Sequence, residues 1–227
     1  MDLLAFLRNQ ARANRIANHR LHASMRPLSH ADYIAPRTSF FPSLAATLEH
    51  ILAVDLYYIA ALHGERDMER VWSTAPHDVP LAALAEAQAA SDRRFIAHVE
   101  ALDAAALDDV VDLIRGGGRI QRERRVHVIA HLINHQVHHR GQAHAMLAGT
   151  AVKPPQLDEF LMPSEAHFRD DDLRALGWTE EKLFSCTTSA RWTTSTSRPS
   201  TSCCASRWRA SSRARSSRTR SRGRTPG

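Results

Sequence analysis

The sequence predicts an all-α protein: an antiparallel four-helix bundle followed by short C-terminal helices and a disordered basic tail. Aromatic residues make up 6% of the 227 residues and glycine occurs nine times, which argues against a β-rich fold. Alanine and leucine are frequent, and both favour helix. Four long stretches repeat apolar residues at helical spacing and are joined by short connections, as in a bundle.

The first two predicted helices span residues 2–22 and 43–63, separated by a loop that contains three prolines. Ser39 or Ser43 could cap the second helix, and Pro42 suits its first turn. At 100° per residue, His50 lies on the same face of this helix as Thr47, Val54, Tyr57, Tyr58 and Ala61. We therefore expect His50 to point inward.

An acid on the second helix needs a partner. Asp55 lies among apolar positions, and Arg140 occupies a similar position on the fourth helix. Because an unpaired buried charge is costly, we expect Asp55 and Arg140 to form an ion pair between the helices. The alternative is that both side chains extend to solvent at the edge of the bundle.

In the middle of the chain, the sequence predicts a loop over residues 65–79 and a third helix over residues 80–102. Residues 110–121 contain Gly116-Gly117-Gly118, which predicts a turn between two short extended pieces. This glycine run lacks the Lys-Ser/Thr that follows it in a phosphate-binding loop, so we interpret it as a plain turn.

The fourth predicted helix, residues 126–149, is rich in histidine. It holds six of the fourteen histidines in the chain: His127, His131, His135, His138, His139 and His144. His135 and His139 fall on its apolar face one turn apart, where two imidazoles can share a metal ion. A single buried histidine is more often hydrogen-bonded in a core than bound to metal. His131 with His135 is an alternative pair.

Together with the inward His50, His135 and His139 predict a three-histidine site for a divalent metal ion. Three imidazoles leave coordination positions open, as in catalytic rather than closed structural sites. Zinc or nickel is favoured by affinity, and iron or manganese is chemically possible. Such an ion lowers the pKa of a bound water or thiol. The candidates for groups around the open positions are His138, Gln142 and Tyr57.

The C-terminal part of the chain changes character near residue 185. Short helices are expected over residues 170–176 and 179–184. Residues 1–186 carry 20 Lys and Arg against 24 Asp and Glu, whereas residues 187–227 carry ten arginines and no acid. We therefore predict a folded domain over residues 1–185 and a disordered tail over residues 186–227. The tail either has no specific role or binds nucleic acid through its arginines.

The positions of the charged residues and cysteines predict the cellular compartment. Charged residues interrupt the N-terminal apolar residues, and Asp55 interrupts the longest apolar run, so neither a signal peptide nor a membrane span is expected. All three cysteines, Cys186, Cys203 and Cys204, lie in or beside the tail. A domain without cysteine fits the reducing cytoplasm.

Residues 132–147, LINHQVHHRGQAHAML, resemble the signature helix of the DinB family, within the DinB/YfiT-like metalloprotein superfamily. (This is the damage-inducible family, not the DNA polymerase of the same name.) Three other segments agree with the resemblance, in order and at suitable spacing: residues 13–18, 40–55 and 154–158. The resemblance covers about residues 1–185.

The resemblance implies a four-helix bundle, often dimeric, with a divalent metal ion held by His50, His135 and His139. Relatives of known activity are metal-dependent enzymes that transfer low-molecular-weight thiols to electrophiles or isomerise thiol adducts. We therefore expect a homodimeric metal-dependent enzyme that acts with a low-molecular-weight thiol and a small electrophile, or a hydrolase that activates a metal-bound water. The alternative is a non-catalytic metal-binding stress-response bundle.

Overall fold

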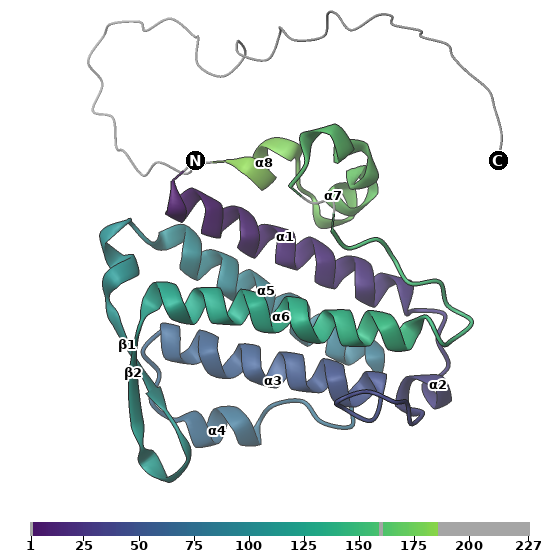
Figure 1. Cartoon of the computed structure of the whole chain (residues 1–227), viewed down its shortest axis with the longest axis horizontal. Coiled ribbons are helices and arrows are strands. Elements are labelled where there is room, and N and C mark those ends of the chain that lie inside the picture. Colours follow the sequence, from purple (N-terminus) through teal and green to yellow (C-terminus); the bar gives the residue numbers. More distant parts are fainter. Residues whose placement is uncertain (1, 159–160, 186–227) are drawn as a thin grey trace, which may run out of the picture. The chain divides into compact units, whose positions relative to one another are not determined.

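The computed structural model describes residues 2–158 and 161–185. This part of the chain is mostly helical, with one two-stranded hairpin, which confirms the predicted all-α class (Figure 1). The predicted tail, residues 186–227, lies outside the described residues. Four long helices correspond to the four predicted ones: α1 Leu3–Ser24, α3 Leu44–Leu62, α5 Leu81–Ala101 and α6 Arg125–Leu147.

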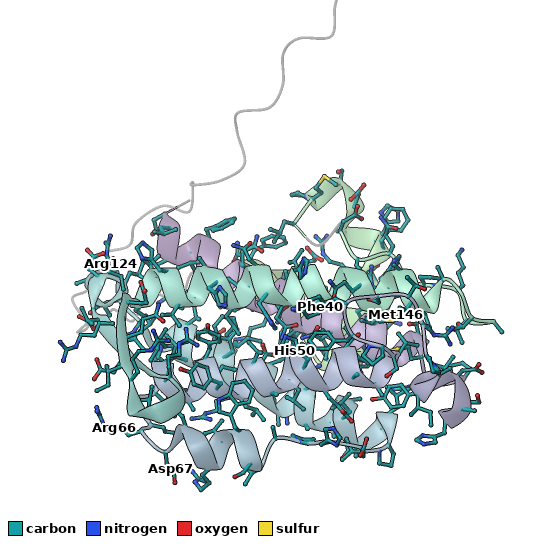
Figure 2. All side chains as sticks on the ribbon, turned by 60° about the horizontal axis from the view of Figure 1, so that its bottom comes forward. Phe40, His50, Arg66, Asp67, Arg124 and Met146 are labelled. Atoms are coloured by element: carbon teal, nitrogen blue, oxygen red, sulfur yellow. The ribbon has the colours of Figure 1, made fainter. Side chains whose placement is uncertain are left out.

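The four long helices lie side by side (Figure 1). α3 and α6 run in opposite directions, because His50 meets His135 while Tyr58, two turns further along α3, meets the earlier His131. α1 and α5 are likewise antiparallel: Arg8 bonds the carbonyl of Leu102, at the C-terminal end of α5. Figure 2 labels Arg124 and Met146 at opposite ends of α6, the helix that carries six of the fourteen histidines.

α3 and α5 run in the same direction, which departs from the predicted antiparallel order, because the chain between them returns along the molecule. Leu48 and Leu84, near the starts of the two helices, share one apolar cluster, and Ile59 and Val99, near their ends, share another. This return contains α4, Met68–Ser73, so the prediction of a plain loop over residues 65–79 is wrong. Asp67 caps α4 by accepting a hydrogen bond from the backbone N–H of Arg70 at 3.0 Å. Met68 and Val71 pack into the core, and Trp72 stacks on Tyr57. Tertiary packing thus stabilises a helix too short to form alone.

The connection between α1 and α3 also contains a short helix, α2, His30–Ile34, capped by Ser29. α3 begins directly after Ser43, whose hydroxyl accepts a hydrogen bond from the N–H of Ala46 at 3.1 Å. Ser43 is therefore the cap rather than Ser39. Pro42 precedes the cap and lies outside the first turn of α3.

The predicted turn at the three glycines is confirmed. Strands β1, Val110–Ile114, and β2, Ile120–Arg124, pair antiparallel from Val110 with Arg124 to Ile114 with Ile120. The 3-10 turn η1, Ala105–Asp108, precedes the hairpin, and the 3-10 turn η2, Gly116–Gly118, closes it. Gly117 and Gly118 have φ of 72° and 75°, a conformation that favours glycine. Val111 and Leu113 bury one face of the hairpin against the helices.

The C-terminal segments pack onto α1. They are η3 Pro163–Phe168, α7 Asp170–Leu176 and α8 Glu180–Phe184, the last two matching the predicted short helices. Leu173 and Leu183 form a small apolar cluster with Ile16. Arg12, fully buried, donates to the carbonyls of Leu183 and Ser185 at 3.2 and 2.9 Å. These bonds tie the end of the domain to α1.

A buried polar layer crosses the core, and it corrects the expected pairing of Asp55 with Arg140. Both side chains are buried, but they form no direct ion pair. Asp55 accepts hydrogen bonds from Gln88 at 2.7 Å and from Gln136. Arg140 donates to Asn14 and Asn18 at 2.6 and 2.8 Å and approaches Oε1 of Gln136 at 3.5 Å. Amide side chains therefore surround both groups, and Gln136, which contacts both, links them.

By length and composition, α3 alone among the helices of the described residues could cross a membrane. However, 78% of the apolar stretch is buried inside the protein, and the acidic Glu49 and Asp55 are buried with it. α3 is therefore the central helix of a core, as its position between α5 and α6 also indicates.

Candidate metal centre

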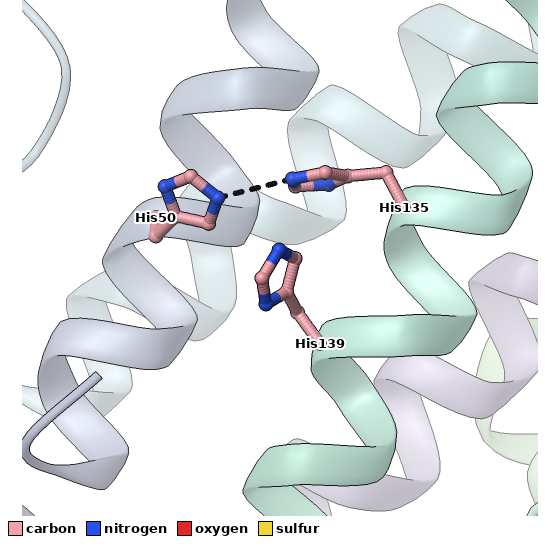
Figure 3. A group of neighbouring side chains, drawn as sticks. All are labelled: His50, His135 and His139. Carbon is pink, nitrogen blue, oxygen red and sulfur yellow. Dashed lines mark hydrogen bonds between the residues drawn. The ribbon is translucent and has the colours of Figure 1, made fainter. Parts of the chain in front are cut away.

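His50 from α3 and His135 and His139 from α6 point toward one another (Figure 3). The Nε2 atoms of His50 and His135 lie 3.0 Å apart. The ring centre of His139 is 4.6 Å from that of His50 and 4.4 Å from that of His135. One ring nitrogen from each residue lies within 4.8 Å of the other two. The i, i+4 spacing aligns the α6 pair, and the antiparallel α3 brings His50 opposite.

This arrangement fits a metal ion better than a hydrogen-bonded cluster. Nitrogen ligands bind zinc at about 2.0–2.1 Å, so two ligands of a tetrahedral ion lie about 3.3 Å apart. The separation of 3.0 Å between His50 and His135 is close to that value. A neutral imidazole has a single N–H donor, so three facing rings cannot satisfy one another fully.

The electrostatics also favour metal binding. Burial, followed by the proximity of His139 and His50, lowers the pKa of His135 to about 3. Burial is also the main cause of the lowered pKa values of His50 and His139. All three imidazoles are therefore neutral near pH 7, and the neutral form is the one that binds metal.

Gln142 orients the ring of His139. Nδ1 of His139 donates to Oε1 of Gln142 at 2.8 Å, which leaves Nε2 as the ligand atom. The amide nitrogen of Gln142 lies 3.2 Å from Nε2 of His138, and the ring of His138 also packs edge-on against that of His139, with ring centres 4.7 Å apart. His135 differs, because its Nδ1 is buried and meets no hydrogen-bond partner within the described residues.

Tyr57 lies away from the three histidines, at the hairpin end of α3. Its hydroxyl donates to the carbonyl of Ile114 at 2.9 Å, and its ring stacks on Trp72. His138, Gln142 and Tyr57 were the predicted neighbours of the open coordination positions. Of these, Gln142 hydrogen-bonds a candidate ligand, His139, whereas Tyr57 packs against β1 and α4.

The other histidines of α6 lie outside the cluster. The ring centre of His131, the alternative partner of His135, is 6.1 Å from it, and His131 packs on Tyr58 at 4.8 Å. His127 is exposed, and His144 is half-buried, with its Nε2 2.9 Å from the carbonyl oxygen of Pro155. The group that converges is therefore His50, His135 and His139.

Two aromatic residues beside the cluster are not evident from the helical pattern. The ring centre of Phe41 lies 4.3 Å from that of His50 and 5.5 Å from that of His139. Phe40 packs edge-on against Phe41, and its ring centre is 6.4 Å from that of His139. Phe40 is 78% exposed. Their place just before the cap of the His50 helix is the signal in the sequence that could have identified them.

Comparison with known proteins agrees with this architecture. The sequence matches the DinB family over residues 5–172, a segment that contains the four long helices and all three converging histidines. No match was found among curated proteins. Since the family match covers most of the chain, the chain belongs to the DinB family.

Proposed function

We propose that this protein is a DinB-type four-helix bundle that binds one divalent metal ion through His50, His135 and His139. The observation that carries the proposal is the convergence of three neutral imidazoles from two helices. Within the described residues, no carboxylate or thiol joins this group. Three protein ligands leave at least one coordination position for an exogenous ligand. Zinc or nickel is the expected ion, with iron or manganese as chemically possible alternatives.

We further propose that the site is catalytic and acts on a low-molecular-weight thiol and a small electrophile. A divalent ion held by His50, His135 and His139 would supply Lewis acidity, which would lower the pKa of a thiol or water near neutral pH. The protein contributes the remaining parts of the site. Gln142 fixes His139, while Phe40 and Phe41 present an apolar wall that suits the body of an electrophile. The same site would support hydrolysis if water replaced the thiol.

The expected setting of this activity is a cytoplasmic homodimer that binds no membrane. Nucleic-acid binding is expected only through the arginine-rich residues 186–227, which lie outside the described residues. A truncation after residue 185 tests this role, because salt-sensitive DNA binding should then disappear.

Metal analysis of protein purified without an affinity tag tests the site. We expect about one divalent ion per wild-type chain and a loss of most of it in His50→Ala and His135→Ala. His127→Ala is the matched control, because His127 is exposed on the same helix. Full metal content in His50→Ala would contradict the three-histidine site.

Turnover tests the chemistry separately. The metal-loaded protein is assayed with glutathione, mycothiol and bacillithiol against monochlorobimane, with His135→Ala as the background. Turnover above that background supports a thiol transferase. Stoichiometric metal without turnover on these or on ester substrates contradicts the catalytic proposal and favours the non-catalytic metal-binding protein.

A further inference from the structure

A cavity with a volume of about 560 Å³ lies between the C-terminal half of α1 and the N-terminal half of α5 and is bordered by α2. Its size is within the range of small-molecule sites. None of His50, His135 and His139 lines it. The cavity is therefore separate from the candidate metal centre, which lies between α3 and α6.

One wall of the cavity is basic. Arg15, His19 and His22 follow one another at spacings of four and three, which places them on one face of α1, and Arg26 follows in the turn just after the helix. Arg26 is exposed, and its guanidinium forms no hydrogen bond or ion pair with the described residues. Arg15 is partly compensated, since its guanidinium lies 3.5 Å from Oδ2 of Asp92. The wall thus carries positive charge that the protein does not fully neutralise.

Two polar atoms of the lining are buried without a partner among the described residues. They are Nδ1 of His22 and the hydroxyl of Tyr33, whose residues are 9% and 2% exposed. Buried polar atoms are nearly always hydrogen-bonded, so these two leave hydrogen-bonding capacity beside the cavity that a ligand or water could satisfy. Burial, together with the Glu49 carboxylate, raises the pKa of Tyr33, so its hydroxyl keeps its proton and can donate. Nδ1 of His22 can also donate, in one neutral tautomer.

The opposite wall is largely apolar and has small side chains. Ala82, Ala85 and Ala89 recur along α5 and leave room for a ligand next to α1. Glu86, an exposed residue, is the acid among the described lining residues. Such a wall suits the hydrophobic body of a ligand, while the basic wall suits an acidic head.

We propose that this cavity is a second binding site, and that its ligand is a small organic anion with a carboxylate or phosphate head on an apolar body. Arg15 and Arg26 would neutralise the head, and His22 and Tyr33 would donate hydrogen bonds to it. Charge-assisted bonds of this kind are among the stronger polar contacts in proteins. The proposal does not depend on the reaction at the metal centre.

Isothermal titration calorimetry on the full-length, metal-loaded protein tests the proposal with 1-naphthoate, 1-naphthyl phosphate and the neutral 1-naphthamide. We expect one anion bound per chain and about tenfold weaker binding of the amide. Arg26→Gln should weaken anion binding at least about fivefold, and Ala85→Phe should abolish it by filling the cavity. Binding of either anion supports the site, and the tighter one identifies the head group.

Two controls locate the binding. Arg119→Gln removes an exposed arginine from the turn of the hairpin and should leave the affinity unchanged. His135→Ala should also bind normally, because the cavity excludes the three histidines. Equal binding of the amide, equal affinities of Arg26→Gln and Arg119→Gln, or loss of binding in His135→Ala would overturn the proposal. Arg26 is exposed, so its variant carries the test if Ala85→Phe fails to fold.

Discussion

Nδ1 of His139 donates a hydrogen bond to Oε1 of Gln142 at 2.8 Å, within a single turn of α6. This contact selects the tautomer in which Nε2 of His139 faces His50 and His135. Groups that orient a metal ligand in this way typically contribute 10–100-fold to metal affinity. We therefore expect Gln142 to support metal binding through its hydrogen bond to His139.

We predict that Gln142→Ala lowers zinc affinity about 10–100-fold without changing the fold. Competition with a chromophoric chelator measures the affinity, and circular dichroism checks the helix content. His127→Ala is the matched control, since His127 is an exposed histidine on the same helix. If His127→Ala and Gln142→Ala weakened zinc binding equally, the orienting role of Gln142 would be wrong.

A second prediction concerns Gln136, which joins Asp55 and Arg140 in the core and is 1% exposed. Gln136→Leu should lower the free energy of unfolding by about 2–4 kcal/mol, because it leaves a buried acid with one hydrogen bond fewer. Urea denaturation of the metal-free protein measures the change. Gln121→Leu, an exposed substitution in β2, should cost less than about 0.5 kcal/mol. A comparable loss in both variants would argue against the buried network.

Helical periodicity was sufficient to predict the long helices and the meeting of the three histidines. The angular position of His135 and His139 depends only on local spacing, and His50 required one further assumption, that α3 packs against α6. Features set by contacts between distant residues could not be predicted in this way. α4 depends on packing of Met68 and Val71 in the core, and the α1–α5 cavity depends on Tyr33 in a segment predicted as a loop. The bridge through Gln136 likewise required positions on several helices.

Phe40 provides a third prediction, which rests on the proposed reaction. Its ring lies beside His139 and is 78% exposed, so Phe40→Ala should leave stability nearly unchanged. If the ring contacts the electrophile in the ground state and the transition state alike, KM for an aromatic electrophile rises several-fold while kcat is retained. Phe168→Ala removes another exposed phenylalanine, from η3, and serves as the control. An unchanged KM in Phe40→Ala would exclude Phe40 from the substrate site.

The fourth prediction is a pH dependence of stability caused by His22. Burial, followed by the charges of Arg15 and Arg140, lowers the pKa of His22 to about 4. The unfolded chain takes up a proton on this residue near pH 6.5, whereas the folded protein does not until about pH 4. His22 therefore makes the metal-free protein less stable as pH falls below about 6.5, by up to about 1.4 kcal/mol per pH unit. Asp92 acts in the opposite sense, because burial raises its pKa to about 6.

Comparison of variants separates the two contributions. Because His22→Leu lacks the titrating group but retains Asp92, its free energy of unfolding should fall less steeply than that of the wild type between pH 6.5 and 4.5. Urea denaturation at several pH values, with metal removed by chelation, measures both curves. His127→Leu reports the effect of losing an exposed histidine. Parallel plots of unfolding free energy against pH for the wild type and His22→Leu would contradict the prediction. They would mean that His22 has the same pKa in the folded and unfolded chains, despite its burial beside Arg15.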